Sequence, residues 1–201
     1  MLTNIRYHSI PGHNGLTFPG VTSLIELFAE YKMIDTYIPK SENMATIGTT
    51  AHALVARINK GGHVGNKEWE TLGTKEQNAV LAFLRWQKAV RFKPREVESL
   101  VYSLKFGVAG HPDASGVCRP WYIGVFDWKL GDVNNIRTKL QVGTYGGCFA
   151  EMHPRRCNFD GFRGVHLDPL KATYKELIMT FEEGQHWFHE FIRMKLQIGI
   201  L

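Results

Sequence analysis

Residues 108–129 read VAGHPDASGVCRPWYIGVFDWK, and this stretch decides which fold we expect. After Pro94 the helical spacing of apolar residues gives way to alternation, which predicts three successive strands at 97–106, 108–117 and 121–129. The last of them is apolar on both faces almost to its end, as is typical of a central strand that is covered from both sides. We therefore expect a strand meander at the centre of a sheet.

This central strand ends in Asp127-Trp128-Lys129. Because side chains alternate along a strand, Asp127 and Lys129 project from the same face. If the turn at 119–121 is centred near Pro120, Asp113 lies opposite Asp127, since the two are equidistant from the proline. Like charges placed opposite each other destabilise a sheet, so we interpret the two carboxylates as ligands of a divalent cation.

Such oxygen ligands suit Mg²⁺ or Mn²⁺, and the lysine beside them is placed to orient or deprotonate water, or to stabilise charge on a phosphoryl oxygen. This is the chemistry of phosphodiester hydrolysis. The competing interpretation is structural: a salt bridge between Asp127 and Lys129 at a strand end, with Asp113 as a turn residue.

Further candidates flank this centre. Glu98 shares a predicted strand face with Leu100, where a carboxylate is unexpected, so it either assists the metal or lies at the exposed start of the strand. His52 lies on a small-residue face of a predicted helix that can approach the sheet closely, which lets it reach the metal; a structural histidine is the alternative. Gln141 and Tyr145 are one helical turn apart, on a face suited either to phosphate and base contacts or to ordinary packing.

Periodicity and capping signals supply the other elements. We expect a hairpin around Asn14-Gly15, helices at about 22–33, 44–58, 74–92, 137–151 and 169–196, and a broken strand within 156–167. Ser23 and Glu26 have the spacing of a capping box. Glycines at 143, 146 and 147 predict close approach of one helix to the sheet or to the substrate.

The fold class that follows is α/β, with a mixed central sheet flanked by helices. We expect a single domain over residues 1–201, made of an N-terminal hairpin with helices (1–93), a catalytic meander with its helix (94–152) and a C-terminal strand with a helix (153–201).

The composition excludes several protein classes. Apolar residues make up 44% and charged residues 21%, which argues against disorder, collagen and coiled coils. There is neither a long apolar run nor a signal peptide, so we expect a cytoplasmic protein without membrane contact. A net charge of +5 permits a polyanionic partner. The three cysteines form no CxxC pair, so we expect no disulfide framework.

Four motifs follow one another along the chain. They are Gly48-Thr49-Thr50-Ala51-His52, Gly110-His111-Pro112-Asp113, Asp127-Trp128-Lys129 and Gln141-Val142-Gly143-Thr144-Tyr145. Together with the segment Phe18–Ser23, they make the chain resemble the RecB-like exonuclease branch of the PD-(D/E)XK nuclease superfamily, which includes the mitochondrial genome maintenance exonucleases and their bacterial and phage relatives. Each motif is weak alone, but four at compatible spacings are a specific signal.

The resemblance implies a restriction-endonuclease-like core and a deoxyribonuclease that depends on one or two Mg²⁺ or Mn²⁺ ions. It assigns His52, Asp113, Asp127 and the main-chain carbonyl of Trp128 as metal ligands, and Lys129 as the catalytic lysine. It also implies that Gln141, Tyr145 and Thr49 support the active site or contact DNA, and that Glu98 supports the site or a second metal. Leu130 departs from the family, in which Thr or Ser often follows the lysine.

The same resemblance implies an exonuclease that acts on single-stranded DNA or DNA ends. It would work with replication, recombination or repair proteins in the cytoplasm of a bacterium or a phage-infected cell. Relatives with an iron–sulfur cluster use four cysteines, and this chain has three, so no cluster is expected.

Three other interpretations stay open on the sequence. A structure-specific or nicking endonuclease uses the same metal core. A nucleic-acid-binding protein can keep the fold without the chemistry, although the complete set of acidic, lysine and histidine residues argues against it. A zinc site at His186, His189 and Glu190 lacks an HExxH pattern, and a surface helix explains these residues better.

Overall fold

The computed structural model describes residues 5–34, 42–119, 122–154 and 159–200. Its elements are β1 (Tyr7–Ser9), β2 (Thr17–Pro19), α1 (Val21–Glu30), α2 (Glu42–Asn59), α3 (Asn66–Thr71), α4 (Thr74–Val90), β3 (Lys93–Val97), β4 (Val101–Ser103), β5 (Val108–Gly110), β6 (Ala114–Cys118), β7 (Tyr122–Lys129), α5 (Ile136–Met152), β8 (Phe159–Leu167), β9 (Tyr174–Met179) and α6 (Phe181–Gln197). None of the helices within these ranges is both long enough and apolar enough to cross a membrane.

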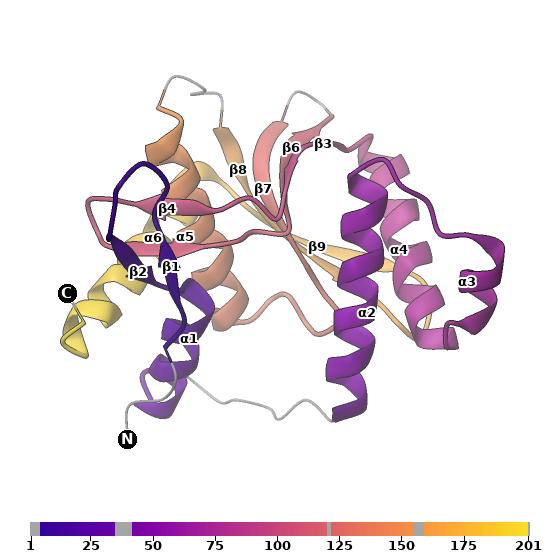
Figure 1. The fold of residues 1–201 in the computed structure, drawn as a ribbon, viewed down its shortest axis with the longest axis horizontal. Helices are drawn as coiled ribbons and strands as arrows, with labels where there is room; N and C mark the ends of the chain where they lie inside the picture. The colour runs from indigo at the N-terminus through magenta and orange to yellow at the C-terminus, as the bar shows by residue number, and fades with distance from the viewer. Residues whose placement is uncertain (1–4, 35–41, 120–121, 155–158, 201) are drawn as a thin grey trace.

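A five-stranded sheet with the order β3-β6-β7-β8-β9 forms the centre of the molecule (Figure 1). β7 pairs antiparallel with β6 and parallel with β8, and the two remaining pairs are antiparallel. The parallel connection between β7 and β8 runs through α5, as a crossover requires. The expected α/β class, with a mixed central sheet flanked by helices, is confirmed.

Helices cover both faces of this sheet (Figure 1). One buried cluster joins α1, α5 and α6 to Val125 and Phe162. The other joins α2 and α4 to Phe126, Trp128 and Val165. Successive residues of β7 therefore enter opposite cores, which is the arrangement predicted for a central strand.

Two small sheets, the β1–β2 hairpin and the β4–β5 hairpin, lie next to α1 and α5 (Figure 1). Ile10, Phe18 and Ala109 form a small buried cluster between them. The predicted turn at Asn14-Gly15 is present: the N–H of Leu16 donates to the carbonyl of His13 at 3.0 Å, and Gly15 has a φ of 76°. The predicted N-terminal hairpin is confirmed.

The register of β6 against β7 is the one predicted from the sequence. Ala114 pairs with Phe126, and each later pair is likewise symmetric about position 120. Pro120 and Trp121, the predicted turn residues, lie outside the described residues. This register brings Asp113, which immediately precedes β6, next to the end of β7.

Of the three predicted strands, the one at 121–129 is confirmed as β7, and the other two are wrong in their extent. The 97–106 strand is divided between β3 and β4, and the 108–117 strand between β5 and β6. Glu98 has a φ of 55°, a left-handed conformation that interrupts a strand, and Pro112 has no N–H for a ladder hydrogen bond. The resulting pieces belong to different sheets, because β4 and β5 form a two-stranded sheet of their own.

The long C-terminal helix predicted at 169–196 is wrong in its first part. Residues Tyr174–Met179 form the edge strand β9, and α6 begins only after Thr180. The hydroxyl of Thr180 accepts a hydrogen bond from the N–H of Glu183 at 3.2 Å, and the Glu183 carboxylate accepts one from the N–H of Thr180 at 2.8 Å. This capping box fixes the start of α6.

The start of α1 also differs from the prediction. Gly20 is the N-cap and no side chain caps this helix, so Ser23 and Glu26 do not form the expected capping box. The other predicted helices correspond to α2, α4 and α5, while the short helix α3 was not predicted. Cys118 and Cys148 are buried free thiols, and Cys157 lies outside the described residues.

The glycines of α5 allow close packing, as predicted. A Cβ atom on Gly146 would lie 1.8 Å from the ring of Phe162 in β8, and one on Gly147 would lie 2.3 Å from the ring of Phe188 in α6. The backbone of α5 therefore approaches both the sheet and α6.

Candidate active site

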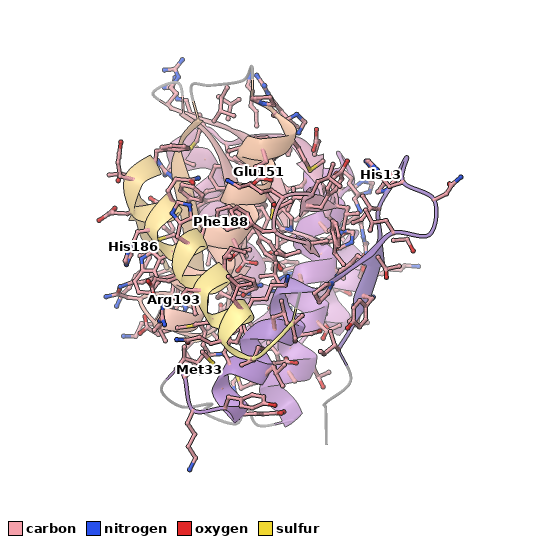
Figure 2. All side chains as sticks on the ribbon, turned by 90° about the vertical axis from the view of Figure 1, so that its left-hand side faces the viewer. His13, Met33, Glu151, His186, Phe188 and Arg193 are labelled. Atoms are coloured by element: carbon pink, nitrogen blue, oxygen red, sulfur yellow. The ribbon has the colours of Figure 1, made fainter. Side chains whose placement is uncertain are left out.

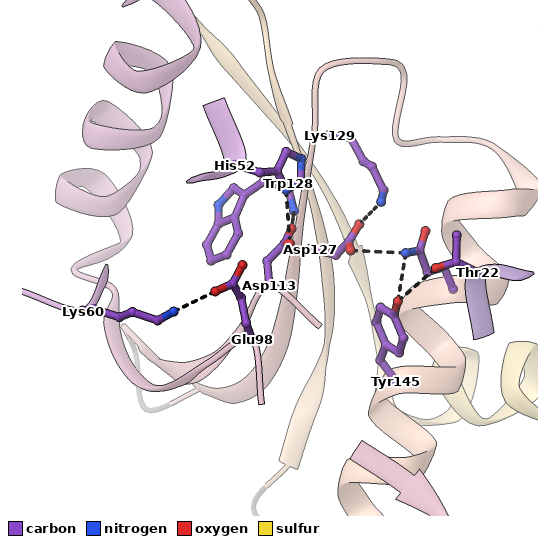
Figure 3. A network of polar contacts seen from close by, with 10 residues as sticks. Thr22, His52, Lys60, Glu98, Asp113, Asp127, Trp128, Lys129 and Tyr145 are labelled. Carbon is purple, nitrogen blue, oxygen red and sulfur yellow. Dashed lines mark hydrogen bonds and ion pairs between the residues drawn. The ribbon is translucent and has the colours of Figure 1, made fainter. Parts of the chain in front are cut away.

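Polar side chains from separate elements meet where β6 begins and β7 ends (Figure 3). α2 contributes His52, the sheet contributes Asp113, Asp127 and Lys129, α5 contributes Gln141 and Tyr145, and α1 contributes Thr22. All of the motif positions that the resemblance singled out, except Thr49 and Glu98, meet in this network through their side or main chains.

Asp113 connects α2 to the end of β7. Its Oδ1 atom lies 3.2 Å from Nδ1 of His52, and its Oδ2 atom accepts a hydrogen bond of 2.6 Å from the main-chain N–H of Trp128. The last pair of the β6–β7 ladder is Ala114 with Phe126, so Asp113 lies just outside the ladder. Its side chain continues the contact between the two strands through the hydrogen bond from Trp128. The indole of Trp128 packs in the core with α2 and α4 instead.

Asp127 and Lys129 form the second part of the site. Their side chains share a face of β7, as predicted, and Nζ of Lys129 lies 2.7 Å from Oδ2 of Asp127. The Asp127 side chain is only 4% exposed, so the charges interact more strongly than they would at the surface. Oδ2 is thus already paired with the Lys129 ammonium, and a bound cation would share this oxygen with Lys129.

A series of polar contacts connects Asp127 to α5 and α1. Nε2 of Gln141 lies 3.5 Å from Oδ1 of Asp127 and donates to the hydroxyl of Tyr145 at 3.1 Å. The Tyr145 hydroxyl also lies 3.4 Å from Oγ1 of Thr22. Gln141 and Tyr145 thus face the site from one side of α5, as predicted. Thr22 is a site residue that the sequence analysis missed; its signal was its place in the Phe18–Ser23 segment.

The two carboxylates have opposite pKa shifts. Burial alone would raise the pKa of Asp113, but the charges of His52 and Lys129 hold this pKa below its ordinary value. Burial raises the pKa of Asp127 above its ordinary value, and Lys129 offsets this only in part. Asp113 is therefore the more firmly ionised of the two.

Three groups around the carboxylates have raised pKa values. Burial lowers the pKa of His52, but Asp113 more than compensates, and the net pKa is raised. Burial likewise opposes the charge on Lys129, but Asp127 and Asp113 raise its pKa above the ordinary value. Burial raises the pKa of Tyr145 to about 12, so its hydroxyl remains a hydrogen-bond donor.

Two predicted site residues lie beside this network. The hydroxyl of Thr49 donates to the carbonyl of Ala45 within α2 at 3.1 Å. The Glu98 carboxylate forms an ion pair of 2.7 Å with Lys60. Glu98 contacts Asp113 through the main chain instead, where its N–H donates a hydrogen bond of 3.1 Å to the Asp113 carbonyl. Neither side chain shares a described contact with the two aspartates.

The three residues of the zinc alternative lie along α6 and apart from the site. His186 and His189 are exposed, and Glu190 pairs with Arg193 at 2.9 Å. Figure 2 faces this helix and shows His186 and Arg193 along its length. These residues therefore lie on a surface helix, as the sequence analysis favoured over a zinc site.

The donor set of the site suits a hard divalent cation. Within the described ranges, no three or more His, Cys, Asp or Glu side chains are already arranged to hold a metal ion. Even so, two carboxylates and an imidazole meet where β6 begins and β7 ends. Mg²⁺ and Mn²⁺ prefer such ligands, and a cation would reduce the repulsion between the buried carboxylates.

The geometry thus combines two neighbouring acids with two basic groups. Lys129 lies 2.7 Å from one acid and His52 lies 3.2 Å from the other.

A comparison with protein-family models and with curated proteins finds no match for this chain.

Proposed function

We propose that this chain is a metal-dependent nuclease of the RecB-like PD-(D/E)XK type, with that superfamily's core, and that it hydrolyses phosphodiester bonds of DNA. The observation that carries the proposal is the meeting of Asp113, Asp127 and Lys129 at one end of an antiparallel strand pair, with His52 beside them. A strand-end salt bridge does not require a second carboxylate nearby, and two carboxylates placed close together repel each other. A metal site gives both carboxylates a reason to be there.

The side chains of His52, Asp113 and Asp127 would hold one or two Mg²⁺ or Mn²⁺ ions, and the family resemblance adds the main-chain carbonyl of Trp128. When bound, such an ion lowers the pKa of a water molecule and stabilises charge on a phosphoryl oxygen.

Lys129 supplies a positive charge next to these ligands. Its pKa is raised because the attraction of Asp127 and Asp113 outweighs the effect of burial. A lysine that holds its proton stabilises the charge that develops on the phosphoryl oxygens, rather than accepting a proton from water. Gln141 and Tyr145 orient Asp127 and offer donors to the substrate phosphate.

The substrate class is supported by charge and by resemblance. A net charge of +5 favours binding of a polyanion. The preference for single-stranded DNA or free ends, and a role in replication, recombination or repair, come from the family resemblance.

The test compares wild type with Lys129→Ala on end-labelled linear and circular single-stranded DNA, with Mg²⁺, Mn²⁺ or EDTA. We expect the wild type to release nucleotides from linear DNA only when a metal ion is present. Lys129→Ala should abolish cleavage and leave the far-UV circular dichroism spectrum unchanged. Lys175→Ala, which removes an exposed lysine of β9, is the matched control and should cleave like wild type.

Equal degradation by wild type and Lys129→Ala would overturn the nuclease assignment. Cleavage of circular DNA would instead identify an endonuclease with the same metal core.

A second candidate is a nucleic-acid-binding protein on the same fold without catalysis. One observation favours it: the described side chains already satisfy much of each carboxylate, through His52 and the Trp128 N–H for Asp113 and through Lys129 for Asp127. DNA binding without metal-dependent release of nucleotides would identify this case.

A further inference from the structure

A hollow lies along α2 beside the candidate site. It has a volume of about 470 Å³, and we call it the α2 hollow after its lining by Ala53, Ala56, Arg57, Lys60, Gly62 and Glu98. Ala56 lies one helical turn after His52 on the same face of α2, and the main-chain N–H of Glu98 donates to the main-chain carbonyl of Asp113 at 3.1 Å. The α2 hollow therefore adjoins both the histidine and one aspartate of the site, and Figure 3 shows its Lys60–Glu98 pair next to Asp113.

The lining combines small side chains with two cations. Ala53 and Ala56 occupy little space, so a chain lying in the hollow can approach the helix closely. Lys60 lies 2.7 Å from Glu98, and Arg57 forms two bonds to Glu68 at 2.6 and 2.8 Å. These pairs are exposed, with 38–55% of each side chain accessible, and exposed ion pairs contribute little stability. A phosphate group can therefore replace either carboxylate at low cost.

Glu98 is fixed at the boundary between the α2 hollow and the site. Its φ of 55° is unusual for a residue other than glycine. Its N–H bonds the carbonyl of Asp113, and its own carbonyl lies 2.8 Å from Nδ1 of His111. These main-chain contacts hold the residue where its carboxylate meets Lys60, so the cation is kept at the edge of the hollow.

We propose that the α2 hollow holds a single strand of DNA next to the bond that is cleaved, with Arg57 and Lys60 bound to its phosphates. The inference rests on the proposed function and specifies its substrate. Its volume is in the range of small-molecule sites, which corresponds to about one or two nucleotides of a single strand. Bound phosphates take the places of Glu98 and Glu68.

The test measures binding of a short fluorescein-labelled oligodeoxythymidylate to the full chain by fluorescence anisotropy, in EDTA and over a range of KCl concentrations. Lys60→Gln and Arg57→Gln should each weaken binding about three- to tenfold and reduce the slope of log affinity against log salt by about one. Glu68→Gln should strengthen binding, because it frees Arg57 from its carboxylate partner. Lys88→Gln, which removes an exposed lysine of α4 outside the hollow, should leave binding unchanged.

Opposite effects of Arg57→Gln and Glu68→Gln separate phosphate binding from a structural role, because loss of a structural ion pair has the same effect from either side. The inference is overturned if Lys60→Gln and Arg57→Gln bind like Lys88→Gln, if Glu68→Gln weakens binding, or if a duplex of equal length binds as tightly as the single strand. Thermal melting checks that each variant folds. Because these measurements exclude metal ions, they are independent of the cleavage test: a failure of Lys129→Ala to abolish cleavage counts against the proposed function, not against the hollow.

Discussion

At the scale of single residues, burial and neighbouring charges give the two aspartates of the site different properties. Asp113 accepts hydrogen bonds from two donors and is stabilised as an anion. Asp127 is more fully enclosed, and it pairs with the ammonium of Lys129 at 2.7 Å. A cation bound between them would favour the ionised form of both carboxylates, including that of Asp127, whose pKa burial raises.

The affinity for Mn²⁺ should depend on pH through His52. Its pKa lies above the ordinary 6.5, because Asp113 outweighs the opposing effect of burial. Only the neutral imidazole can bind a metal, so protons compete with Mn²⁺ below the raised pKa. The apparent affinity should rise as the pH increases through this pKa and then level off. Isothermal titration calorimetry in buffers of different ionisation enthalpy measures the protons released.

The control for this prediction is His52→Gln, which has no titrating imidazole. It should lose the pH dependence near neutrality and keep a weaker one at lower pH from Asp127, whose pKa burial raises. If His52→Gln keeps the pH dependence of the wild type, His52 is not a ligand.

At this scale, sequence reasoning succeeded where the geometry is local. Asp113 and Asp127 are brought together by one hairpin register, which equal spacing about position 120 determines. Glu98 was misplaced because its left-handed backbone cannot be read from the alternation of side chains. Thr22 was missed because its contact with Tyr145 joins positions far apart in the sequence.

At the scale of elements, α5, α6 and β8 meet around the ring of Phe162. A Cβ atom would lie 1.8 Å from this ring on Gly146 and 2.0 Å from it on Gly184. Gly146→Ala should therefore lower the free energy of unfolding by about 1–3 kcal/mol or more, because the core must shift to accept it. Urea denaturation measures the change. Gly131→Ala, whose Cβ meets nothing within 4 Å, should have little effect, and equal losses for the two variants would contradict the packing.

The start of α6 supports a second prediction. Thr180→Ala removes a side chain that accepts a hydrogen bond from Glu183, so it should cost about 1 kcal/mol of stability. Thr74→Ala is the matched control, because it removes an exposed threonine at the start of α4, which has no side-chain cap. Thermal or urea unfolding should therefore show a loss for the first variant only. A comparable loss for Thr74→Ala would mean that the cap of α6 is not the cause.

The elements that the sequence did not reveal are those held by distant contacts. In β9, Glu176 pairs with Arg163 of β8 at 2.7 Å and accepts a hydrogen bond from the indole of Trp86 in α4 at 2.9 Å. Local periodicity contains neither partner, so residues 174–179 resembled the beginning of a helix. The Thr180 and Glu183 pair was a usable signal, since a capping box marks where a helix begins.

At the scale of the whole molecule, the site lies between the two cores. His52 comes from α2, which packs on one face of the sheet, while Gln141 and Tyr145 come from α5 on the other. Lys129 and the aspartates lie between these layers at the strand ends. A cation bound here would connect the layers, so its binding should be visible in the stability of the entire fold.

Mn²⁺ should therefore raise the melting temperature. A ligand that binds only the folded chain stabilises it by about 2.7 kcal/mol when its concentration exceeds Kd by about a hundredfold. Differential scanning calorimetry with and without EDTA measures the shift, with each variant compared with its own EDTA scan. Asp113→Asn should lose most of the shift, because it removes the carboxylate that His52 contacts. Glu70→Gln, which changes an exposed carboxylate on α3, should keep it. If Asp113→Asn and Glu70→Gln retain the same Mn²⁺ shift, Asp113 is not a ligand of the ion.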